Sequence, residues 1–385
     1  MSPRDNLKTN GRSKPRVVVA GGYNADLLIR CKTPLVAGKS LVGGPMQIYA
    51  GGRGANCAVA AARAGCAVAF VGAYGRDWFG GMALSQLAGE SIDLDYFFEL
   101  PHVKTGTSLS LIEAGTGKHF LICAESANDR VTPKMVHSAR DLVLSADLVI
   151  SELEIPSRTV WAVMKLCEQH SIPFVLDISP LNRINCLPDN KILLVVSESI
   201  EEAMAITSTK TVPDAIQELH RLGCQNVVLI NNSREVTYSD RQKIETKVVP
   251  VESVIDRCGA TECLETWIGL SLIRQKSLAE GCEEAILAMA YSLSRMGGHH
   301  SMPRRSDIRI GRGHTRVLRR YRQSVNRFVD PPPSSTTATI SCIWLVTVSY
   351  WLDHSIPCGN KITRCESSTW ERPIATVTFQ GLSAC

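Results

Sequence analysis

The chain has 385 residues, an apolar fraction of 44% and a formal net charge of +5, values typical of a folded globular protein with one large or two small domains. Residues 309–385 contain ten Lys or Arg and four Asp or Glu, a net charge of +6, so the rest of the chain carries −1. This nearly neutral body argues against nucleic acid as a partner, and the apolar stretch at 340–352 is too short to span a membrane.

Both ends of the chain differ from its centre. Residues 1–15 are polar and basic without an apolar core, so we expect a disordered lead and no signal peptide. From residue 309 the apolar periodicity stops, and the Pro-rich segment at 331–337 is typical of a linker. We therefore expect one domain at 16–308 and a basic tail of little structure at 309–385. The tail is either a divergent appendage or, as we favour, the translation of non-coding or shifted sequence.

The chain contains 14 cysteines, of which ten precede residue 309 without CxxC pairs or His partners at zinc spacing. Cys57, Cys66, Cys167 and Cys224 have apolar neighbours, so we expect them to be small buried side chains. Because we expect no signal peptide, we expect a reducing compartment, the cytoplasm or the nucleus, and free thiols.

Short apolar runs alternate with segments of helical periodicity along the body, the pattern of a parallel sheet covered on both faces. Two stretches differ, since residues 29–50 and 108–124 alternate in polarity or are broken by Gly, with a turn at 115–117. They predict a small exposed β-layer within segments of about 24–50 and 101–125. We expect strands at 17–20, 67–73, 148–151, 174–178, 193–196 and 227–230, and helices at 55–64, 78–88, 133–144, 158–170, 214–222, 260–273 and 283–296.

The first predicted strand ends in two glycines and is followed by Asn24 and Asp26. Residues two apart in an extended chain point to the same side, and open α/β sheets bind ligands at the carboxyl ends of their strands. An amide and a carboxylate placed there can bind neighbouring hydroxyl groups. An Asx turn or a helix cap is the alternative, but it explains one of these residues more easily than both.

The segment at 51–65, GGRGANCAVAAARAG, places three glycines in four positions before an alanine-rich helix. Glycine allows a ligand or a neighbouring strand to approach where a Cβ would clash, and Asn56 falls in the first turn of that helix. The glycine spacing fits neither the dinucleotide fingerprint nor the phosphate-binding P-loop. Taken alone, the segment is explained equally well by a ligand site and by close helix packing.

Further motifs follow in order: VGAYGRDWFG at 71–80, TGT at 105–107, ELEIP at 152–156, VIDRCGATE at 254–262 and GGHHSMP at 297–303. Together with GGYNADL at 21–27 and the glycine-rich segment, they resemble the ribokinase-like (PfkB) family of sugar kinases over about residues 16–308. The resemblance implies an α/β fold, a three-layer α/β/α sandwich with a central, mostly parallel sheet and a small β-sheet lid. It also implies that the lid covers the sugar and joins two subunits in a homodimer.

The resemblance assigns the sugar contacts to residues near the glycine-rich segment and after the strand at 148–151. Arg53 stands where the family usually has Lys, and the two cations differ in geometry. A solvated acid at a helix start would explain Glu154 equally well without the resemblance. The six residues are Asn24, Asp26, Gly52, Arg53, Asn56 and Glu154.

The catalytic segment departs from the family pattern Asp-Thr-Thr-Gly-Ala-Gly-Asp, because residues 256–262 are Asp-Arg-Cys-Gly-Ala-Thr-Glu. By resemblance, Glu262 is the base, and the backbone amides of Gly259, Ala260 and Thr261 stabilise the transferred phosphoryl group. Glu262 is one methylene longer than the Asp of the family, and a displacement of about 1 Å can lower a rate about 10²-fold. Thr261 replaces a glycine that lets the backbone approach the phosphate.

The nucleotide side is altered as well. The Asn-x-x-Glu of the family appears as Ser199 and Glu202, of which Glu202 would support magnesium-bound water. Its Gly-x-x-Gly turn appears as Asn232 and Glu235, without either glycine. The sugar side is therefore nearly intact, while the ATP side departs at several positions.

Two ions follow from the resemblance: Mg²⁺ with ATP, and a monovalent activator, usually K⁺. Asp256, Gly297 and Ser301 match the positions that hold the monovalent cation. The adjacent His299 and His300 invite a metal interpretation, but neighbouring residues in an extended chain point apart. We therefore interpret the two histidines as loop residues.

The resemblance predicts an ATP-dependent kinase that phosphorylates D-ribose at its 5-hydroxyl to D-ribose 5-phosphate. The altered catalytic segment is expected to reduce the rate. Two alternatives stay open: a sugar-binding pseudokinase of the same fold that has lost catalysis, and a kinase of this family that acts on another sugar or on a nucleoside.

Overall fold

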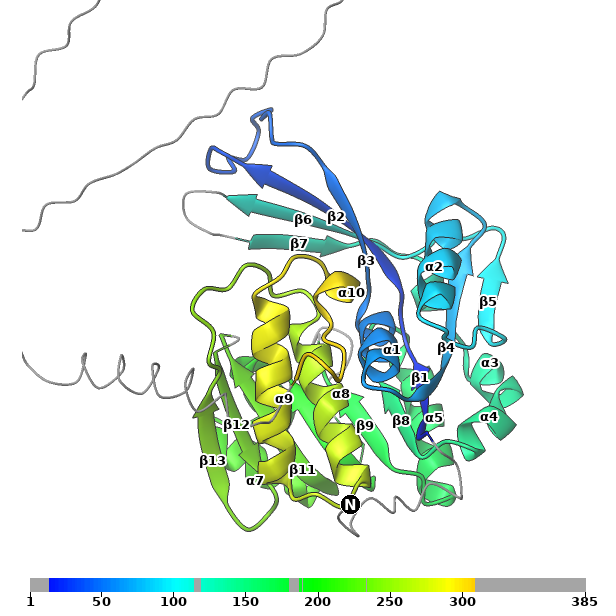
Figure 1. Ribbon diagram of the computed structural model, residues 1–385, viewed down its shortest axis with the longest axis vertical. Coiled ribbons are helices and arrows are strands. Elements are labelled where there is room, and N and C mark those ends of the chain that lie inside the picture. Colours follow the sequence, from blue (N-terminus) through cyan, green and yellow to red (C-terminus); the bar gives the residue numbers. More distant parts are fainter. Residues whose placement is uncertain (1–13, 114–118, 180–186, 189, 233, 309–385) are drawn as a thin grey trace, which may run out of the picture. The chain divides into compact units, whose positions relative to one another are not determined.

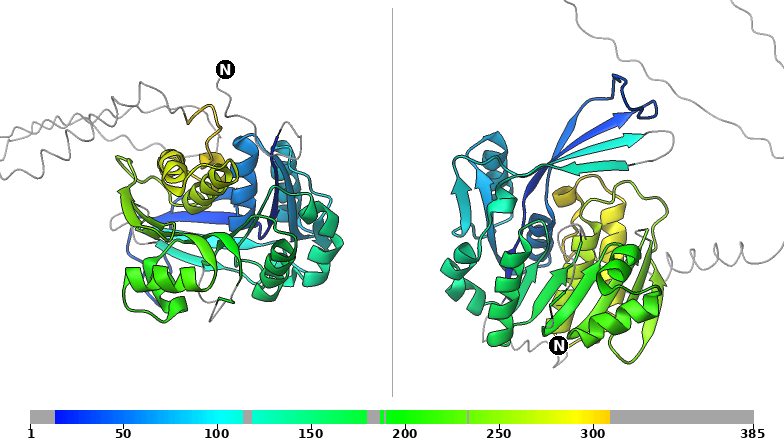
Figure 2. Two further views of the ribbon diagram at one scale, coloured as in Figure 1. Left: turned by 90° about the horizontal axis from the view of Figure 1, so that it is seen from below. Right: turned by 180° about the vertical axis from the view of Figure 1, so that it is seen from behind.

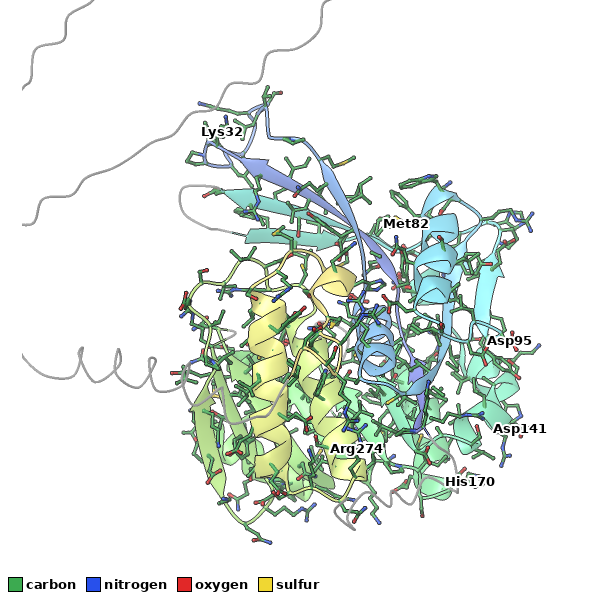
Figure 3. All side chains as sticks on the ribbon, viewed as in Figure 1. Lys32, Met82, Asp95, Asp141, His170 and Arg274 are labelled. Carbon is green, nitrogen blue, oxygen red and sulfur yellow. The ribbon has the colours of Figure 1, made fainter. Side chains whose placement is uncertain are left out.

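The computed structural model describes residues 14–308 apart from 114–118, 180–186, 189 and 233. The expected tail, the turn at 115–117 and all but the last two residues of the expected lead lie outside the described residues. Nearly all of the expected domain at 16–308 is described, and its side chains fill the space between the sheet and the helices (Figure 3).

A nine-stranded sheet in the order β13-β12-β11-β10-β9-β8-β1-β4-β5 forms the centre of this domain (Figure 1). The strands from β11 to β5 pair in parallel, and the β12–β13 hairpin pairs antiparallel at the other edge. The strands are β1 (Arg16–Ala20), β4 (Ala67–Gly75), β5 (Phe97–Leu100), β8 (Leu148–Ser151), β9 (Phe174–Asp177), β10 (Ile192–Ser197), β11 (Cys224–Asn231), β12 (Glu235–Ser239) and β13 (Ile244–Val248).

Helices cover both faces of the sheet, because successive residues of the buried strands point to opposite sides. Val17 and Val19 pack with one helix layer, and Val18 and Ala20 pack with the other. The three-layer arrangement is seen end-on in Figure 2, and it confirms the expected α/β/α sandwich. The first layer contains α1 (Arg53–Arg63), α2 (Trp78–Gly89), α8 (Ala260–Ile273) and α9 (Leu278–Leu293), and the second contains α3 (Pro133–Ser138), α4 (Arg140–Leu144), α5 (Ser157–Gln169), α6 (Ile200–Thr207) and α7 (Val212–Arg221).

A second, four-stranded sheet in the order β3-β2-β6-β7 projects from one end of the main sheet (Figure 1). It confirms the expected small β-layer, although its first strand begins at Asn24, earlier than the alternation in polarity indicates. We call this sheet the lid sheet. Its strands are β2 (Asn24–Cys31), β3 (Gln47–Gly51), β6 (Thr107–Glu113) and β7 (His119–Cys123).

The structure corrects three sequence expectations. The helix expected at 133–144 is two helices, since α3 ends at Ser138 and α4 begins at Arg140. The last long helix begins at Leu278 rather than at 283, because Ser277 and Glu280 form a capping box, a sequence signal that the prediction missed. The two histidines lie in a short helix, α10 (Gly298–Ser301), rather than in a loop.

The described cysteines are free, and Cys57, Cys66, Cys167 and Cys224 are buried as expected. Among the residues that the structure describes, no helix combines the length and the apolar composition needed to cross a membrane.

Candidate active site

Acidic residues stand at the carboxyl ends of three neighbouring parallel strands. Glu152 follows β8, Asp177 ends β9, and Glu198 follows β10. Parallel strands end at the same edge of a sheet, so their side chains gather there. The sequence analysis missed all three as site residues, although an acid directly after each apolar run was the available signal.

Two glycine-rich segments meet closely at the same edge. A Cβ built on Gly54 at the start of α1 would lie 2.7 Å from the Cα of Gly21, which follows β1. Gly52 caps the helix with a φ of 90°, a conformation that favours glycine. The glycines therefore bring the first turn of α1 against the end of β1. Close packing, one of the two explanations of the sequence, accounts for Gly54.

Replacing Gly54 with Ala is expected to destabilise the protein by about 1–3 kcal/mol, because the new methyl group meets rigid backbone. Urea unfolding measures the loss. Gly89, a glycine of α2 with nothing within 4 Å of its virtual Cβ, is the matched control, and Gly89→Ala should be neutral or stabilising. Equal stability of the Gly54 variant and the wild type would contradict the close approach.

The predicted sugar-binding residues lie together around Glu154. Its Oε1 accepts a hydrogen bond from Asn24 Nδ2 at 3.0 Å, and its Oε2 accepts one from the backbone N–H of Arg53 at 2.8 Å. Asp26 points from β2 and accepts a hydrogen bond from Ser108 Oγ at 2.6 Å. Glu154 is therefore a bonded, half-buried acid, and the solvated helix-start alternative is wrong.

Asn56 and Asn128 complete this polar group. Asn56 is buried in the first turn of α1, and its Oδ1 has no hydrogen-bond partner, so an acceptor remains for a ligand or water. Asn128, which the sequence analysis missed, donates from Nδ2 to Asn24 Oδ1 at 3.0 Å. It also accepts from the backbone N–H of Tyr23 at 3.2 Å. Asn128 thus fixes the amide of Asn24, and it belongs to the short 3₁₀ turn Ala127–Arg130.

The Arg53 guanidinium joins the sugar-side residues to the predicted base. Its Nη1 lies 3.0 Å from Glu262 Oε1 and 3.0 Å from Asp177 Oδ2, and its Nη2 lies 2.5 Å from Glu198 Oε2. The side chains of Arg53, Asp177 and Glu262 are at most 10% exposed, so these charges interact with little screening by water. We call Arg53, Asp177, Glu198 and Glu262 the Arg53 cluster.

Several carboxyl groups around this cation have raised pKa values. Burial raises the pKa of Glu262 to about 7, although the neighbouring Arg53 guanidinium lowers it. Burial likewise raises the pKa of Glu154 and of Asp177 to about 7, against the same guanidinium. For Asp26, burial raises the pKa to about 7 and the Ser108 hydroxyl lowers it. Carboxyl groups with such pKa values can exchange protons at neutral pH.

The predicted anion-stabilising residues form the start of α8. Gly259 caps the helix in the left-handed region, with φ of 82°. Ala260, Thr261 and Glu262 form the first turn, whose backbone N–H groups have no acceptor within the helix. The positive end of a helix dipole suits a phosphate or a developing negative charge. Thr261 is buried there, so its side chain occupies space that a glycine would leave free.

The predicted nucleotide residues follow neighbouring strands, Ser199 after β10 and Asn232 after β11. Ser199 caps α6, and its Oγ accepts the backbone N–H of Glu202 at 3.2 Å. Asn232 takes a φ of 49°, so it adopts the left-handed conformation that a glycine would favour. Glu235 begins β12 and accepts a hydrogen bond from a neighbouring amide at 2.9 Å. The backbone N–H of Arg234 donates to the carbonyl oxygen of Asn231 at 3.0 Å, so the chain reverses between β11 and β12.

The three predicted cation-binding residues are brought together. Asp256 Oδ2 accepts the backbone N–H of Gly297 at 2.8 Å, and Asp256 Oδ1 accepts that of Cys258 at 3.1 Å. Ser301 Oγ lies 2.9 Å from the carbonyl oxygen of Gly298. Carboxylate, hydroxyl and carbonyl oxygens are the ligands that hard cations prefer, so the residues fit such an ion.

The two adjacent histidines have different surroundings. His299 is buried, and burial lowers its pKa to about 3, so the ring is neutral. The ring stacks edge-on against Tyr23 at a centroid distance of 6.2 Å. His300 instead contacts Tyr49, at 6.1 Å. The two rings therefore pack against different aromatic residues, and no group of three or more His, Cys, Asp or Glu suited to a metal occurs in the described part of the chain.

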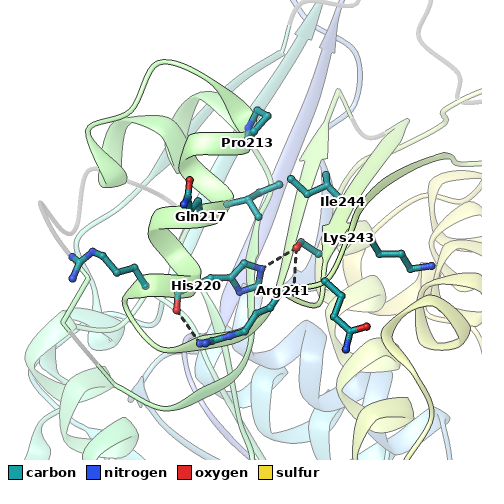
Figure 4. Close-up of a pocket in the computed structure, with 10 residues that line it drawn as sticks. Pro213, Gln217, His220, Arg241, Lys243 and Ile244 are labelled. Atoms are coloured by element: carbon teal, nitrogen blue, oxygen red, sulfur yellow. Dashed lines mark hydrogen bonds between the residues drawn. The ribbon is translucent and has the colours of Figure 1, made fainter.

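A surface groove of about 610 Å³ lies elsewhere, between α7 and the β12–β13 hairpin (Figure 4). His220 contacts the Cys224 carbonyl oxygen and Ser239 Oγ at 2.9 Å each, and Arg241 donates to the carbonyl oxygen of His220 at 2.8 Å. Ser239 pairs with Val227 near the start of β11, so the groove lies toward the amino ends of the parallel strands, whereas the candidate site lies at their carboxyl ends. None of the predicted site residues lines it.

Comparisons with known proteins show the family and the fold of this chain. The sequence pattern of the pfkB family carbohydrate kinases matches residues 14–305. The chain is 28% identical to the ribokinase of Bacillus subtilis (strain 168) over 294 residues, 76% of this chain and 97% of the relative. It is 25% identical to the ribokinase of Arabidopsis thaliana over 304 residues, 76% and 80% of the two chains. The structure of Arabidopsis thaliana ribokinase complexed with ribose and ATP has a TM-score of 0.69 at 24% identity, covering 79% of this chain and 99% of that one, so the fold is ribokinase-like.

Proposed function

Because the chain belongs to the pfkB family of carbohydrate kinases, we propose that it transfers the γ-phosphoryl group of ATP to the 5-hydroxyl of D-ribose. The observation that carries this proposal is the Arg53 contact, which joins Glu262 at the start of α8 to residues able to bind a polyol. The ribokinases of Bacillus subtilis and Arabidopsis thaliana are among the relatives of this chain, and they support ribose as the substrate.

Different residues bind the sugar, accept the proton and stabilise the transferred group. Asn24, Asp26 and Glu154 bind sugar hydroxyl groups, and Glu262 takes the proton from the attacking hydroxyl as its oxygen bonds to phosphorus. The bond from phosphorus to the β,γ-bridging oxygen breaks, and ADP leaves. The first amides of α8 stabilise the charge on the transferred group. Glu202 would support the water ligands of Mg²⁺, and the ion would neutralise phosphate charge when bound with ATP.

The proposal includes K⁺ as an activator held near Asp256, Gly297 and Ser301, since the oxygen atoms gathered there suit a monovalent cation. It also takes residues 16–308 as the kinase domain, with 1–15 and 309–385 outside it. The free thiols of the described residues support a reducing compartment, and we propose the cytoplasm or the nucleus.

The function is tested with the purified full chain, MgATP, K⁺ and D-ribose, and release of ADP is the expected result. D-2-deoxyribose, D-fructose and adenosine, assayed in parallel, identify a different substrate if one gives a higher kcat/KM. The runner-up is a sugar-binding protein without catalysis, which the buried Thr261 at the phosphate-binding turn favours. A rise of the Tm with ribose but no ADP would support that alternative and contradict the kinase.

The lid sheet supports a homodimer. Its edge strand β7 exposes Phe120, Leu121 and Ile122 at 44%, 57% and 61%, and an exposed apolar edge strand is a site for pairing with another chain. A second copy of the lid sheet would cover these side chains. We expect a dimer in sedimentation velocity and a monomer for Ile122→Lys. The matched variant Ile244→Lys, which changes an isoleucine of β13 exposed at 47%, should remain a dimer. A monomeric wild type would contradict this assignment.

A further inference from the structure

The Arg53 guanidinium contacts three carboxylates through its two terminal nitrogens. Nη1 lies 3.0 Å from Asp177 Oδ2, 3.0 Å from Glu262 Oε1 and 3.2 Å from Glu198 Oε2. Glu198 Oε2 lies closer still to Nη2, at 2.5 Å, so the two terminal nitrogens of one guanidinium are shared among three carboxylates. Glu262 therefore receives only a share of the positive charge beside it.

Asp177 and Glu198 are held in place independently of Arg53. Asp177 Oδ1 accepts the backbone N–H of Ser179 at 2.9 Å, and Ser179 Oγ accepts the backbone N–H of Glu198 at 3.1 Å. The two acids also belong to the ends of the paired strands β9 and β10. The Asp177 carboxylate and the backbone of Glu198 are therefore held where the guanidinium extends from α1.

We propose that Asp177 and Glu198 are positioning residues that hold the Arg53 guanidinium beside Glu262 and share its charge, so that Glu262 keeps the basicity needed to accept the sugar proton. This role rests on the proposed kinase function. A carboxylate paired alone with a guanidinium is a weak base, because an adjacent opposite charge lowers its pKa by about 1–3 units. The sharing in this cluster limits that effect, in agreement with the raised pKa of Glu262.

Other titratable groups also act on Glu262, from every element that packs around it. They are carboxyl groups and thiols, and they are the same in the variants used below, so a change in the variants reports on Asp177 and Glu198. They include Asp26 on β2, Cys57 on α1, Glu154 after β8, Cys258 before α8, and Cys263 and Glu265 on α8.

A direct test measures the titration of Glu262 in the full chain by ¹³C NMR with carboxyl-labelled Glu, its signal being the one lost in Glu262→Gln. In Asp177→Asn the pKa of Glu262 should fall by about one unit, since the remaining charge of Arg53 goes to Glu262. Glu198→Gln should also lower the pKa of Glu262, because Glu198 is the neighbouring carboxylate that raises this pKa most. An unchanged or raised pKa in both variants overturns the proposal. Because the Glu198 side chain is partly exposed, Glu198→Gln should fold even if Asp177→Asn does not, and its titration alone then tests the proposal.

The pH profile of kcat/KM is the second readout. Its acidic limb should move to lower pH in Asp177→Asn and Glu198→Gln, and the maximal rate should fall. In Glu198→Asp the acidic limb should return to the pH of the wild type. Asp141→Asn, a change of the same type at a side chain 98% exposed on α4 (Figure 3), should leave the profile unaltered. A rate loss that is equal at all pH values would indicate a purely structural role and overturn the proposal. A wild type that phosphorylates no sugar contradicts the proposed function instead, and the NMR titration still decides whether the two acids control Glu262.

Discussion

Replacement of Glu262 by Gln is expected to lower kcat for D-ribose by about 10²–10⁴-fold, the usual contribution of a general base. The amide has nearly the same size and can still accept a hydrogen bond from Arg53, which lies 3.0 Å from Glu262 Oε1. It cannot take the proton of the sugar hydroxyl. The KM for D-ribose should change far less than kcat, because the polyol contacts of Asn24 and Glu154 remain. A coupled assay of ADP release measures both constants.

The pH dependence of the wild type provides an independent check on the base. Burial raises the pKa of Glu262 to about 7, and only the ionised form accepts a proton, so kcat/KM should rise between pH 6 and pH 8. The rising limb should be absent from any residual activity of Glu262→Gln. A Glu262→Gln variant that keeps the rate of the wild type would place the base elsewhere.

Thr261→Gly serves as the companion variant, and it should increase the rate if the buried Thr261 side chain hinders the phosphate.

Replacement of Arg53 by Gln is expected to cost about 3–5 kcal/mol of folding stability, since it leaves buried carboxylates without their cation. The loss should be larger at pH 8 than at pH 6. When the pKa of a carboxyl group is higher in the folded state than in the unfolded state, the folding stability of the protein falls as the pH rises from the unfolded pKa to the folded pKa. In the wild type that decline ends near pH 7 for Asp177 and Glu262. Without Arg53 their folded pKa values rise further, so the decline continues above pH 7.

Urea unfolding of the Arg53 variants at both pH values measures this effect. Arg53→Lys retains the positive charge and should recover most of the stability, although an ammonium group cannot match the geometry of the guanidinium. An equal loss in Arg53→Gln at pH 6 and pH 8 would show that packing of the side chain, rather than its charge, stabilises the cluster.

Local sequence signals located most of the secondary structure of the described residues. The helix expected at 260–273 is α8 with the same bounds, and the strand expected at 148–151 is β8. Continuous apolar runs mark such buried strands because both of their faces are covered. The hairpin of β12 and β13 escaped prediction, since β13 at the sheet edge alternates between exposed and half-buried residues and contains Lys247 and Glu245.

The sequence by itself predicted the sheet with helices on both faces, a glycine-rich segment before α1, and residue types after β1 and β8 that can bind a polyol. The tertiary structure alone decided that Arg53 meets Glu262, 209 positions away in the chain, and that Asp177 and Glu198 share the same guanidinium. The physical reason is that periodicity depends on neighbours along the chain, whereas an ion pair depends on which strand ends the topology brings to one edge. Its strength then depends on how much water the packing removes, and no local pattern records that.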